Sequence, residues 1–230
     1  MLEKLKEAVC QANLDLVKEG LVIHTWGNVS GIDRAKGLVV IKPSGVAYDG
    51  MRPDDMVIVS LADGKTVESK LKPSSDTVTH LALYRAFPEI GGIAHTHSLY
   101  ATAWAQAKKP IPALGCTQAD YWFGEIPCTR LLTPREIKGP YEVNTGNAII
   151  ERFARIDYRQ FPGALVASHG PFTWGKDPAE AVHNSVVLEF VAKLASETMR
   201  LEPNITAIQP ELRERHFLRK RGPEKYYGQD

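Results

Sequence analysis

The sequence predicts one α/β domain whose sheet is built from several short strands. Its 230 residues suit one large domain better than two small ones, so we expect residues 1–230 to form a single domain. Segments with apolar residues at helical spacing are interspersed with short β-like runs, without a repeat, a low-complexity segment or a linker. Because helices and strands do not alternate regularly, a doubly wound parallel sheet is not the expected architecture.

The first half of the chain contains two predicted helices and several strands. Residues 2–19 carry apolar side chains at helical spacing, and Gly20 is suited to end this helix. A second helix is expected over 77–87, where Pro88 stops it. Strands are predicted where short apolar runs lie between Gly, Asn, Pro and Asp residues, over 21–24, 38–41, 56–60 and 91–97.

The second half is more helical and includes one long irregular stretch. Helices are predicted over 101–106, 145–155, 177–199 and 207–221, with a loop-rich stretch over 110–141 and a short apolar strand over 164–167. Asp177 is suited to cap the long helix because Pro178 follows it at the first helical position.

Composition argues against several classes of protein. Lys and Arg total 28 and Asp and Glu total 27, so a main role in non-specific binding to nucleic acid or a membrane surface is not expected. No apolar run reaches the ~18 residues that a membrane helix needs, and the glycine-rich dinucleotide and triphosphate motifs are missing from the sequence. Cys10, Cys116 and Cys128 lie far apart, which favours a reducing cytoplasm over a disulfide framework or a thiolate zinc site.

The motif His95-Thr96-His97 is the strongest local sign of chemistry. On a strand, residues i and i+2 point to the same face, so both imidazoles can converge on one point. Neutral imidazole is a common ligand for zinc and related ions, and these two side chains have no evident apolar packing role. The alternative is a pair of half-exposed histidines at a strand end, hydrogen-bonded to the backbone.

A second strand end strengthens the metal hypothesis. His169 follows the predicted strand at 164–167 and could supply a third imidazole. Asp76 could supply a carboxylate, although an Asp at the start of a helix is often only a cap. Three histidines and a carboxylate suit zinc, and manganese or cobalt would tolerate the same ligands.

Short loops with hydroxyl groups, glycine and lysine suggest a phosphate site. Hydroxyls, free backbone N–H groups at a helix N-terminus and one Lys are what a phosphate dianion prefers. Each loop alone is more often an ordinary turn, so the hypothesis depends on their recurrence. The candidate residues are Gly27, Asn28, Lys42, Ser44, Gly45, Ser74 and Ser75.

The remaining polar residues have simpler interpretations. We interpret His24, His80 and His183 as core or surface histidines with satisfied hydrogen bonds. The basic run over 213–221 is interleaved with Glu residues and predicts a solvated helix face rather than a nucleic-acid site. Cys116 has no base paired with it in the sequence, so we do not assign it as a nucleophile.

Several segments together resemble the epimerase members of the class II sugar-phosphate aldolase family. They occupy one register from residue 1 to the last few residues, and as a set they are far more specific than any one motif. The segments are residues 25–30, 41–46, 72–77, 91–98, 123–130, 168–172, 177–184 and 226–229.

This resemblance implies a fold, an assembly and a set of functional residues. The subunit would be a three-layer α/β/α structure with a mainly antiparallel sheet, in a ring-shaped homotetramer with active sites at the subunit interfaces. One zinc ion per subunit would be bound by Asp76, His95, His97 and His169. Phosphate and substrate contacts would fall on Gly27, Asn28, Lys42, Ser44, Gly45, Ser74 and Ser75, and proton transfer on Asp120 and a neighbouring subunit's Tyr227.

The resemblance also implies an activity. A metal-dependent epimerase would interconvert L-ribulose 5-phosphate and D-xylulose 5-phosphate by breaking the C3–C4 bond and re-forming it on the opposite face. Since the C4 oxygen points opposite ways before and after, a proton carrier is needed on each face. Cys116 and Gln118 stand where the family usually has Thr and His, beside Asp120, which puts the pKa and orientation of Asp120 in question.

Two alternatives are weighed against the epimerase. A class II aldolase would release an aldehyde and dihydroxyacetone phosphate, but such relatives carry a Glu as catalytic base where this chain has the shorter Asp76. A non-catalytic interaction domain of the same fold would be expected to have lost the metal and proton-transfer residues, which are all present in this sequence.

Overall fold

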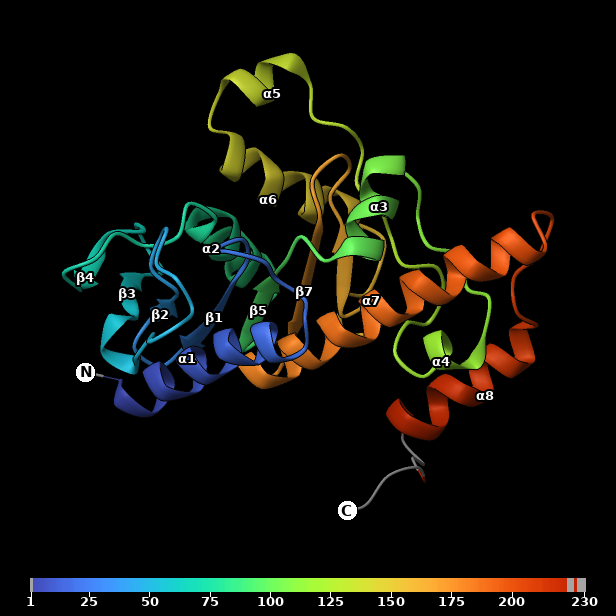
Figure 1. Ribbon diagram of the computed structural model, residues 1–230, viewed down its shortest axis with the longest axis horizontal. Helices are drawn as coiled ribbons and strands as arrows, with labels where there is room; N and C mark the ends of the chain where they lie inside the picture. Colours follow the sequence, from blue (N-terminus) through green and yellow to red (C-terminus); the bar gives the residue numbers. More distant parts are fainter. Residues whose placement is uncertain (1, 223–225, 227–230) are drawn as a thin grey trace.

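A computed structural model describes residues 2–222 and 226, and its centre is a seven-stranded sheet (Figure 1). The strand order is β4-β3-β2-β1-β5-β7-β6, and neighbouring strands are antiparallel throughout. This confirms the predicted mainly antiparallel sheet. The strands are β1 (Asn28–Asp33), β2 (Leu38–Ile41), β3 (Val57–Ser60), β4 (Thr66–Glu68), β5 (Gly92–His95), β6 (Gly163–Leu165) and β7 (Pro171–Gly175).

The helices of the described residues are α1 (Glu3–Lys18), the 3-10 helix η1 (Pro53–Asp55), α2 (Thr77–Ala86), α3 (Leu99–Ala107), α4 (Cys116–Ala119), α5 (Pro134–Lys138), α6 (Tyr141–Arg152), α7 (Pro178–Leu201) and α8 (Pro210–Arg221). One face of the sheet is covered by α2 and α6, and the other by α1 and α7. Among the described residues, no helix combines the length and apolar character that crossing a membrane requires.

The alternation of side chains along each strand explains the three layers. In β2, Val39 and Ile41 belong to the core cluster under α2 and α6, whereas Val40, between them, packs in the cluster under α1. Both kinds of position are fully buried, so the strand is apolar on both faces. On the α1 side, α7 packs against α1, β5 and β7 and completes that layer.

The predicted strand over 21–24 is wrong. Gly20 adopts φ +67° and ends α1 as expected, and the backbone N–H of Leu21 donates to the carbonyl of Leu16 at 2.9 Å. Leu21 then packs in the same core cluster as Leu16, and His24 turns the chain with φ +53°. Residues 21–24 therefore cap helix α1 and pack Leu21 against it. A short apolar run with this role has the same sequence pattern as a short strand.

The predicted loop over 110–141 also differs in part, because it contains α4 and α5. A capping box starts α5: the Thr133 hydroxyl accepts from the Glu136 N–H, and the Glu136 carboxylate accepts from the Thr133 N–H. The helix expected from residue 145 begins earlier, at Tyr141 directly after Pro140. That earlier start places the first turn of α6 beside the candidate site.

Candidate active site

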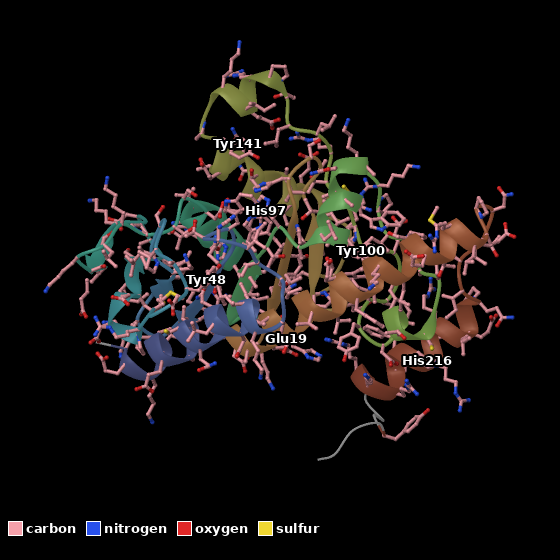
Figure 2. The ribbon with its side chains drawn as sticks, viewed as in Figure 1. Glu19, Tyr48, His97, Tyr100, Tyr141 and His216 are labelled. Carbon is pink, nitrogen blue, oxygen red and sulfur yellow. The ribbon has the colours of Figure 1, made fainter. Side chains whose placement is uncertain are left out.

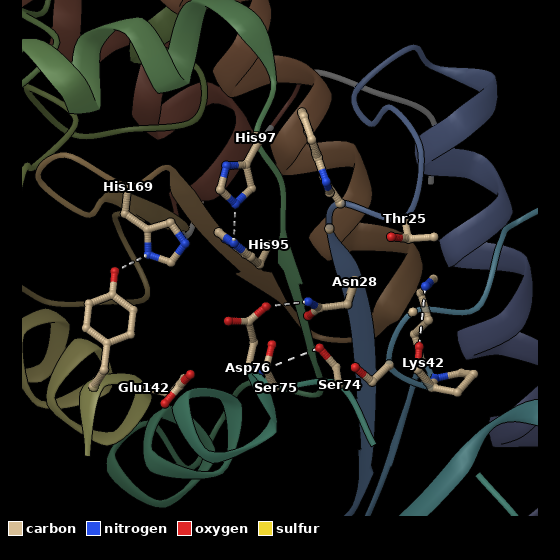
Figure 3. A pocket seen from close by; sticks show the side chains of 16 residues that line it. Thr25, Asn28, Lys42, Ser74, Ser75, Asp76, His95, His97, Glu142 and His169 are labelled. Atoms are coloured by element: carbon tan, nitrogen blue, oxygen red, sulfur yellow. Dashed lines mark hydrogen bonds between the residues drawn. The ribbon is translucent and has the colours of Figure 1, made fainter. Parts of the chain in front are cut away.

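A pocket of about 620 Å³ lies where the central strands of the sheet begin or end (Figure 3). The start of β1 and the end of β5 meet there, since Asn28 lies opposite His95, and the start of β7 adjoins them because His95 lies opposite Phe172. The lining residues are Thr25, Trp26, Gly27, Asn28, Lys42, Pro43, Ser44, Gly45, Ser74, Ser75, Asp76, His95, His97, Tyr141, Glu142 and His169. All eleven residues predicted for metal, phosphate or substrate binding are among them.

Three imidazoles converge in this pocket. Ring nitrogens of His95, His97 and His169 all lie within 4.8 Å of one another, and the Nε2 atoms of His95 and His97 are 3.2 Å apart. His95 is the last residue of β5, and His97 lies two residues beyond it, so the strand predicted over 91–97 ends earlier than expected. His169 follows Val166 in a turn where Ser168 adopts φ +64°. This spacing is small enough for one metal ion to bind all three rings.

The surroundings of the histidines prepare them as ligands. His95 Nδ1 lies 2.9 Å from the carbonyl of Pro171 and donates to it, which leaves Nε2 with its lone pair toward the other rings. Phe172 stacks on the His95 ring at 4.2 Å between centroids. Burial lowers the pKa of His169 to about 3, and burial together with His95 lowers the pKa of His97, so both rings are neutral at pH 7. Neutral imidazole is the form that binds a metal.

Asp76 lies at the start of α2 with its carboxylate in the same pocket. It makes no side-chain cap, and its Oδ2 instead accepts from the Asn28 amide at 2.7 Å. Burial alone would raise the pKa of Asp76, but His95, His80 and the Asn28 hydrogen bond outweigh burial and lower it. The ordinary helix-cap interpretation is therefore not supported, and an ionised carboxylate faces the histidines.

The two loops proposed for phosphate lie side by side. The Ser44 N–H donates to the Lys72 carbonyl, and the Ser74 N–H donates to the Lys42 carbonyl, at 2.9 and 3.0 Å. This pairing brings the hydroxyls of Ser44 and Ser74 to one wall beside the start of α2. Gly27 completes the wall with φ +104°, and a Cβ there would lie 2.9 Å from the His95 carbonyl oxygen.

Lys42 is a buried cation at the edge of this wall. Its ammonium donates to the Val46 carbonyl at 2.7 Å and lies 4.7 Å from the centroid of the Tyr48 ring. Burial lowers the pKa of Lys42 to about 8. Among the described residues, this ammonium contacts carbonyl oxygens and an aromatic ring, so it is suited to bind an incoming anion.

Sequence reasoning missed Tyr141 and Glu142, which line the pocket from the first turn of α6. The Tyr141 hydroxyl lies 3.4 Å from Nδ1 of His169, the contact drawn as a dashed line at His169 in Figure 3. Tyr141 was the last residue of the predicted loop, and Glu142 lay between that loop and the helix predicted from residue 145. The only available signal was Pro140, which commonly precedes or starts a helix.

Asp120 is not among the described residues that line the pocket. It caps α4 and forms an ion cluster with α8, which Figure 2 places far from His97. Arg219 binds both of its oxygens at 3.0 and 2.9 Å, His216 Nδ1 lies 3.0 Å from Oδ1, and Lys220 lies 3.5 Å from Oδ2. Burial alone would raise the pKa of Asp120, but Arg219, His216 and Lys220 lower it.

The other residues of the predicted proton-transfer region have simple positions. Gln118 is buried and donates to the Gly124 carbonyl at 3.0 Å, so it holds the loop after α4. Cys116 is exposed at the start of that helix. Tyr227 lies outside the described residues, and its role stays a prediction.

Comparison with known proteins agrees with this architecture and site. The family model described as Class II Aldolase and Adducin N-terminal domain matches residues 7–196. The chain therefore belongs to the class II aldolase and adducin family. Two curated proteins named L-ribulose-5-phosphate 4-epimerase UlaF, from Salmonella paratyphi A (strain ATCC 9150 / SARB42) and Salmonella typhi, are each 57% identical to it over 228 residues. That alignment covers 99% of this chain and 100% of each relative.

Solved structures show the same fold. An L-fuculose 1-phosphate aldolase matches with a TM-score of 0.78 at 26% identity, covering 93% of this chain and 94% of its own. The L-fuculose-1-phosphate aldolase from Thermus thermophilus matches with a TM-score of 0.70 at 23% identity, covering 89% of this chain and 100% of its own. The expected class II aldolase-like architecture is confirmed.

Proposed function

We propose that this chain is a metal-dependent epimerase that interconverts L-ribulose 5-phosphate and D-xylulose 5-phosphate. The observation that carries the proposal is one pocket holding both a histidine cluster and a paired-loop anion site, in a chain 57% identical over its full length to L-ribulose-5-phosphate 4-epimerases. A sugar phosphate needs both features, one for its phosphate and one for its reacting oxygens.

The metal site is proposed to hold one divalent ion per subunit, with zinc as the first choice and manganese or cobalt as substitutes. His95, His97 and His169 would bind through ring nitrogens, and Asp76 would contribute a carboxylate oxygen. The fit is supported by neutral rings, a defined His95 tautomer and an ionised acid in one pocket. When bound, such an ion stabilises negative charge that develops on substrate oxygens.

The opposite side of the pocket is proposed to hold the phosphate group. Lys42 would supply charge, while hydroxyls and backbone N–H groups would supply directed donors. Asn28 links the two sides, since its Nδ2 binds Asp76 and its buried Oδ1 has no hydrogen-bond partner among the described residues. That oxygen is suited to accept from a substrate hydroxyl. The proposed anchors are Gly27, Asn28, Lys42, Ser44, Gly45, Ser74 and Ser75.

Proton transfer is proposed to require a second copy of the chain. Cleaving C3–C4 turns the C4 hydroxyl into an aldehyde and releases its proton, and re-formation from the other face returns a proton. Asp120 and Tyr227 are the proposed carriers, and Asp120 lies away from the pocket of its own chain. A homotetramer whose active sites are shared between subunits would bring a neighbour's Asp120 to this pocket.

Further parts of the proposal concern the chain and its compartment. We propose that residues 1–230 form one domain, which the single seven-stranded sheet with its flanking helices supports. A cytoplasmic location is proposed because the substrate is phosphorylated and because Cys10, Cys116 and Cys128 are free thiols. We propose a role in pentose catabolism, in the breakdown of L-arabinose, ascorbate or another L-sugar.

An aldolase is the second candidate, favoured by the structural match to an L-fuculose 1-phosphate aldolase. One assay separates the two: purified protein is given L-ribulose 5-phosphate before chelation, after chelation and after zinc is restored. D-Xylulose 5-phosphate that disappears on chelation and returns with zinc is the expected result. Free aldehyde released from a sugar 1-phosphate, without epimerisation by metal-replete protein, would replace the epimerase with the aldolase.

A further inference from the structure

His80 is a buried polar residue that the proposed reaction does not use. It lies in the first turn of α2, four residues after Asp76, and its ring is fully buried against Phe172 at 5.9 Å between centroids. The sequence interpretation was a core or surface histidine with satisfied hydrogen bonds. The structure shows a core histidine with one nitrogen unsatisfied among the described residues: Nε2 has no hydrogen-bond partner there.

The other ring nitrogen ends a buried hydrogen-bond chain. The Tyr84 hydroxyl lies 2.9 Å from the Ser30 hydroxyl, which in turn lies 2.7 Å from His80 Nδ1. The ring is fully buried and its hydrogen-bond partner is a neutral hydroxyl, so it is neutral and carries one proton. The chain can run from Tyr84 to Ser30 to Nδ1, which leaves the proton on Nε2, or it can run in the reverse direction.

The two directions differ in what they leave unpaired. In the first direction, both hydroxyl protons and Nδ1 are satisfied, and only the Nε2–H remains. In the reverse direction, the Tyr84 hydroxyl proton has no acceptor among the three hydrogen-bonded side chains. The Nε2 atom then carries no proton, and its lone pair lies on the side of α2 where Asp76 is. The first direction satisfies more groups, and buried polar groups in proteins are satisfied as a rule.

The nearby anion is Asp76. Residues i and i+4 share one face of a helix, and the backbone N–H of His80 donates to the Asp76 carbonyl at 3.0 Å. Asn28 occupies Oδ2 of Asp76, while no hydrogen bond to Oδ1 is recorded among the described residues.

We propose that His80 is a positioning residue for Asp76: the His80 Nε2–H, which has no direct partner among the described residues, reaches the Asp76 carboxylate through one internal water. This inference rests on the metal site in the proposed function. With Asn28 on one oxygen and His80 behind the other, the carboxylate is held in one orientation toward the three histidines. Outer partners of this kind typically change metal affinity by about 10- to 100-fold.

Amide replacements separate the two ring nitrogens. In His80→Gln the terminal amide nitrogen can reach the place of Nε2, so zinc affinity measured by chelator competition should stay within about threefold of wild type. In His80→Asn the shorter amide reaches only the place of Nδ1, and His80→Leu has no polar group. Both should bind zinc about 10- to 100-fold more weakly.

Tyr84→Phe is the matched control, since it disturbs the same buried chain while Ser30 can still donate to His80. It should bind zinc as wild type does. An equal loss in Tyr84→Phe and His80→Leu, or wild-type affinity in His80→Asn, would overturn the proposal. Wild-type protein that binds zinc but does not epimerise would refute the proposed function and leave this test standing.

A spectroscopic test covers the case in which the His80 variants do not fold. In wild-type protein labelled with ¹⁵N-histidine, His80 should be neutral and protonated on Nε2 at pH 7. Its Nε2–H signal should move when zinc is added, because zinc draws on the carboxylate that this N–H reaches through the water. A ring protonated on Nδ1, or a signal that zinc leaves in place, would overturn the proposal.

Discussion

The pocket with the histidine cluster and the segment with Asp120 carry the two halves of one proposed reaction, yet they are built differently. In the pocket, the three histidines lie at or just beyond strand ends, and the pairing of β5 with β1 and with β7 brings these ends together. Asp120 instead lies at the end of the short helix α4, where it pairs with Arg219 and Lys220 of α8 and contacts His216. The first half is assembled within one chain, whereas the second presents its acid away from its own pocket.

The difference shows which parts of the proposed site one chain can supply by itself. Binding of a metal and a phosphate needs fixed geometry, and the ends of central strands and two paired loops are fixed within one chain. Proton transfer needs a group of suitable pKa at the correct face of the substrate. Because Arg219, His216 and Lys220 keep the pKa of Asp120 low, its carboxylate is ionised at neutral pH, and loosening these contacts would make it a stronger base.

The largest expected effect comes from breaking the metal half. His97→Asn should lower the epimerisation rate at least about a thousandfold, because the loss of electrophilic stabilisation is worth several kcal/mol. Zinc bound per subunit, measured by elemental analysis, should fall with it. His183→Asn is the control, since that histidine is exposed and contacts Tyr121 outside the pocket. Near-normal turnover by zinc-free His97→Asn would refute the metal role.

The next effect comes from breaking the other half. Asp120→Asn should slow epimerisation by about 10²- to 10⁴-fold, the usual contribution of a general acid or base. Zinc content should stay at the wild-type level, because Asp120 does not line the pocket. A parallel loss of zinc would contradict the separation of the two halves.

Mixing the two variants tests whether one active site is built from two subunits. Subunits carrying His97→Asn retain Asp120, and subunits carrying Asp120→Asn retain the metal ligands, so a shared site can contain one intact half from each. Unfolding and refolding the two together should restore part of the activity. A mixture of His95→Asn and His97→Asn subunits should restore none. Failure of the first mixture to recover, while refolded wild type does, would place both halves in one chain.

The sequence predicted that His95, His97 and His169 converge, for a physical reason. An apolar run that ends in His-x-His is visible as one short motif, although β5 itself ends at His95 and His97 lies just beyond it. His169 followed another apolar run at a second strand end. By contrast, the contact of Tyr141 with His169 and the hydrogen bond from His95 Nδ1 to the Pro171 carbonyl depend on tertiary packing. No local periodicity in the sequence predicts such contacts. The strand expected at 21–24 was wrong because packing of Leu21 onto α1 leaves the same apolar signal as a strand.

A smaller effect concerns the charge on the phosphate side. Because burial lowers the pKa of Lys42 to about 8, its ammonium charge is lost as the pH rises through 8. The KM for the sugar phosphate should rise above that pH, by up to about 10- to 100-fold, the worth of one charge-assisted hydrogen bond. KM measured between pH 7 and pH 9.5 checks this.

The matched variant for this prediction is Lys42→Arg. A guanidinium stays charged throughout this range, so its KM should vary little with pH even where the absolute value is raised. An identical pH profile in wild type and Lys42→Arg would assign the change to another group.

The smallest expected effect concerns the Tyr141 hydroxyl, which lies 3.4 Å from Nδ1 of His169. A ligand histidine usually donates its second N–H to such an oxygen, which fixes the ring and its tautomer. Since 3.4 Å is long for a hydrogen bond, Tyr141→Phe should weaken zinc binding by about tenfold or less, with a matching rise in the zinc needed for half-maximal activity. Tyr158→Phe, whose hydroxyl binds Glu89 on the surface, should change neither quantity. Equal zinc affinity in both variants would mean that His169 is oriented by its strained turn alone.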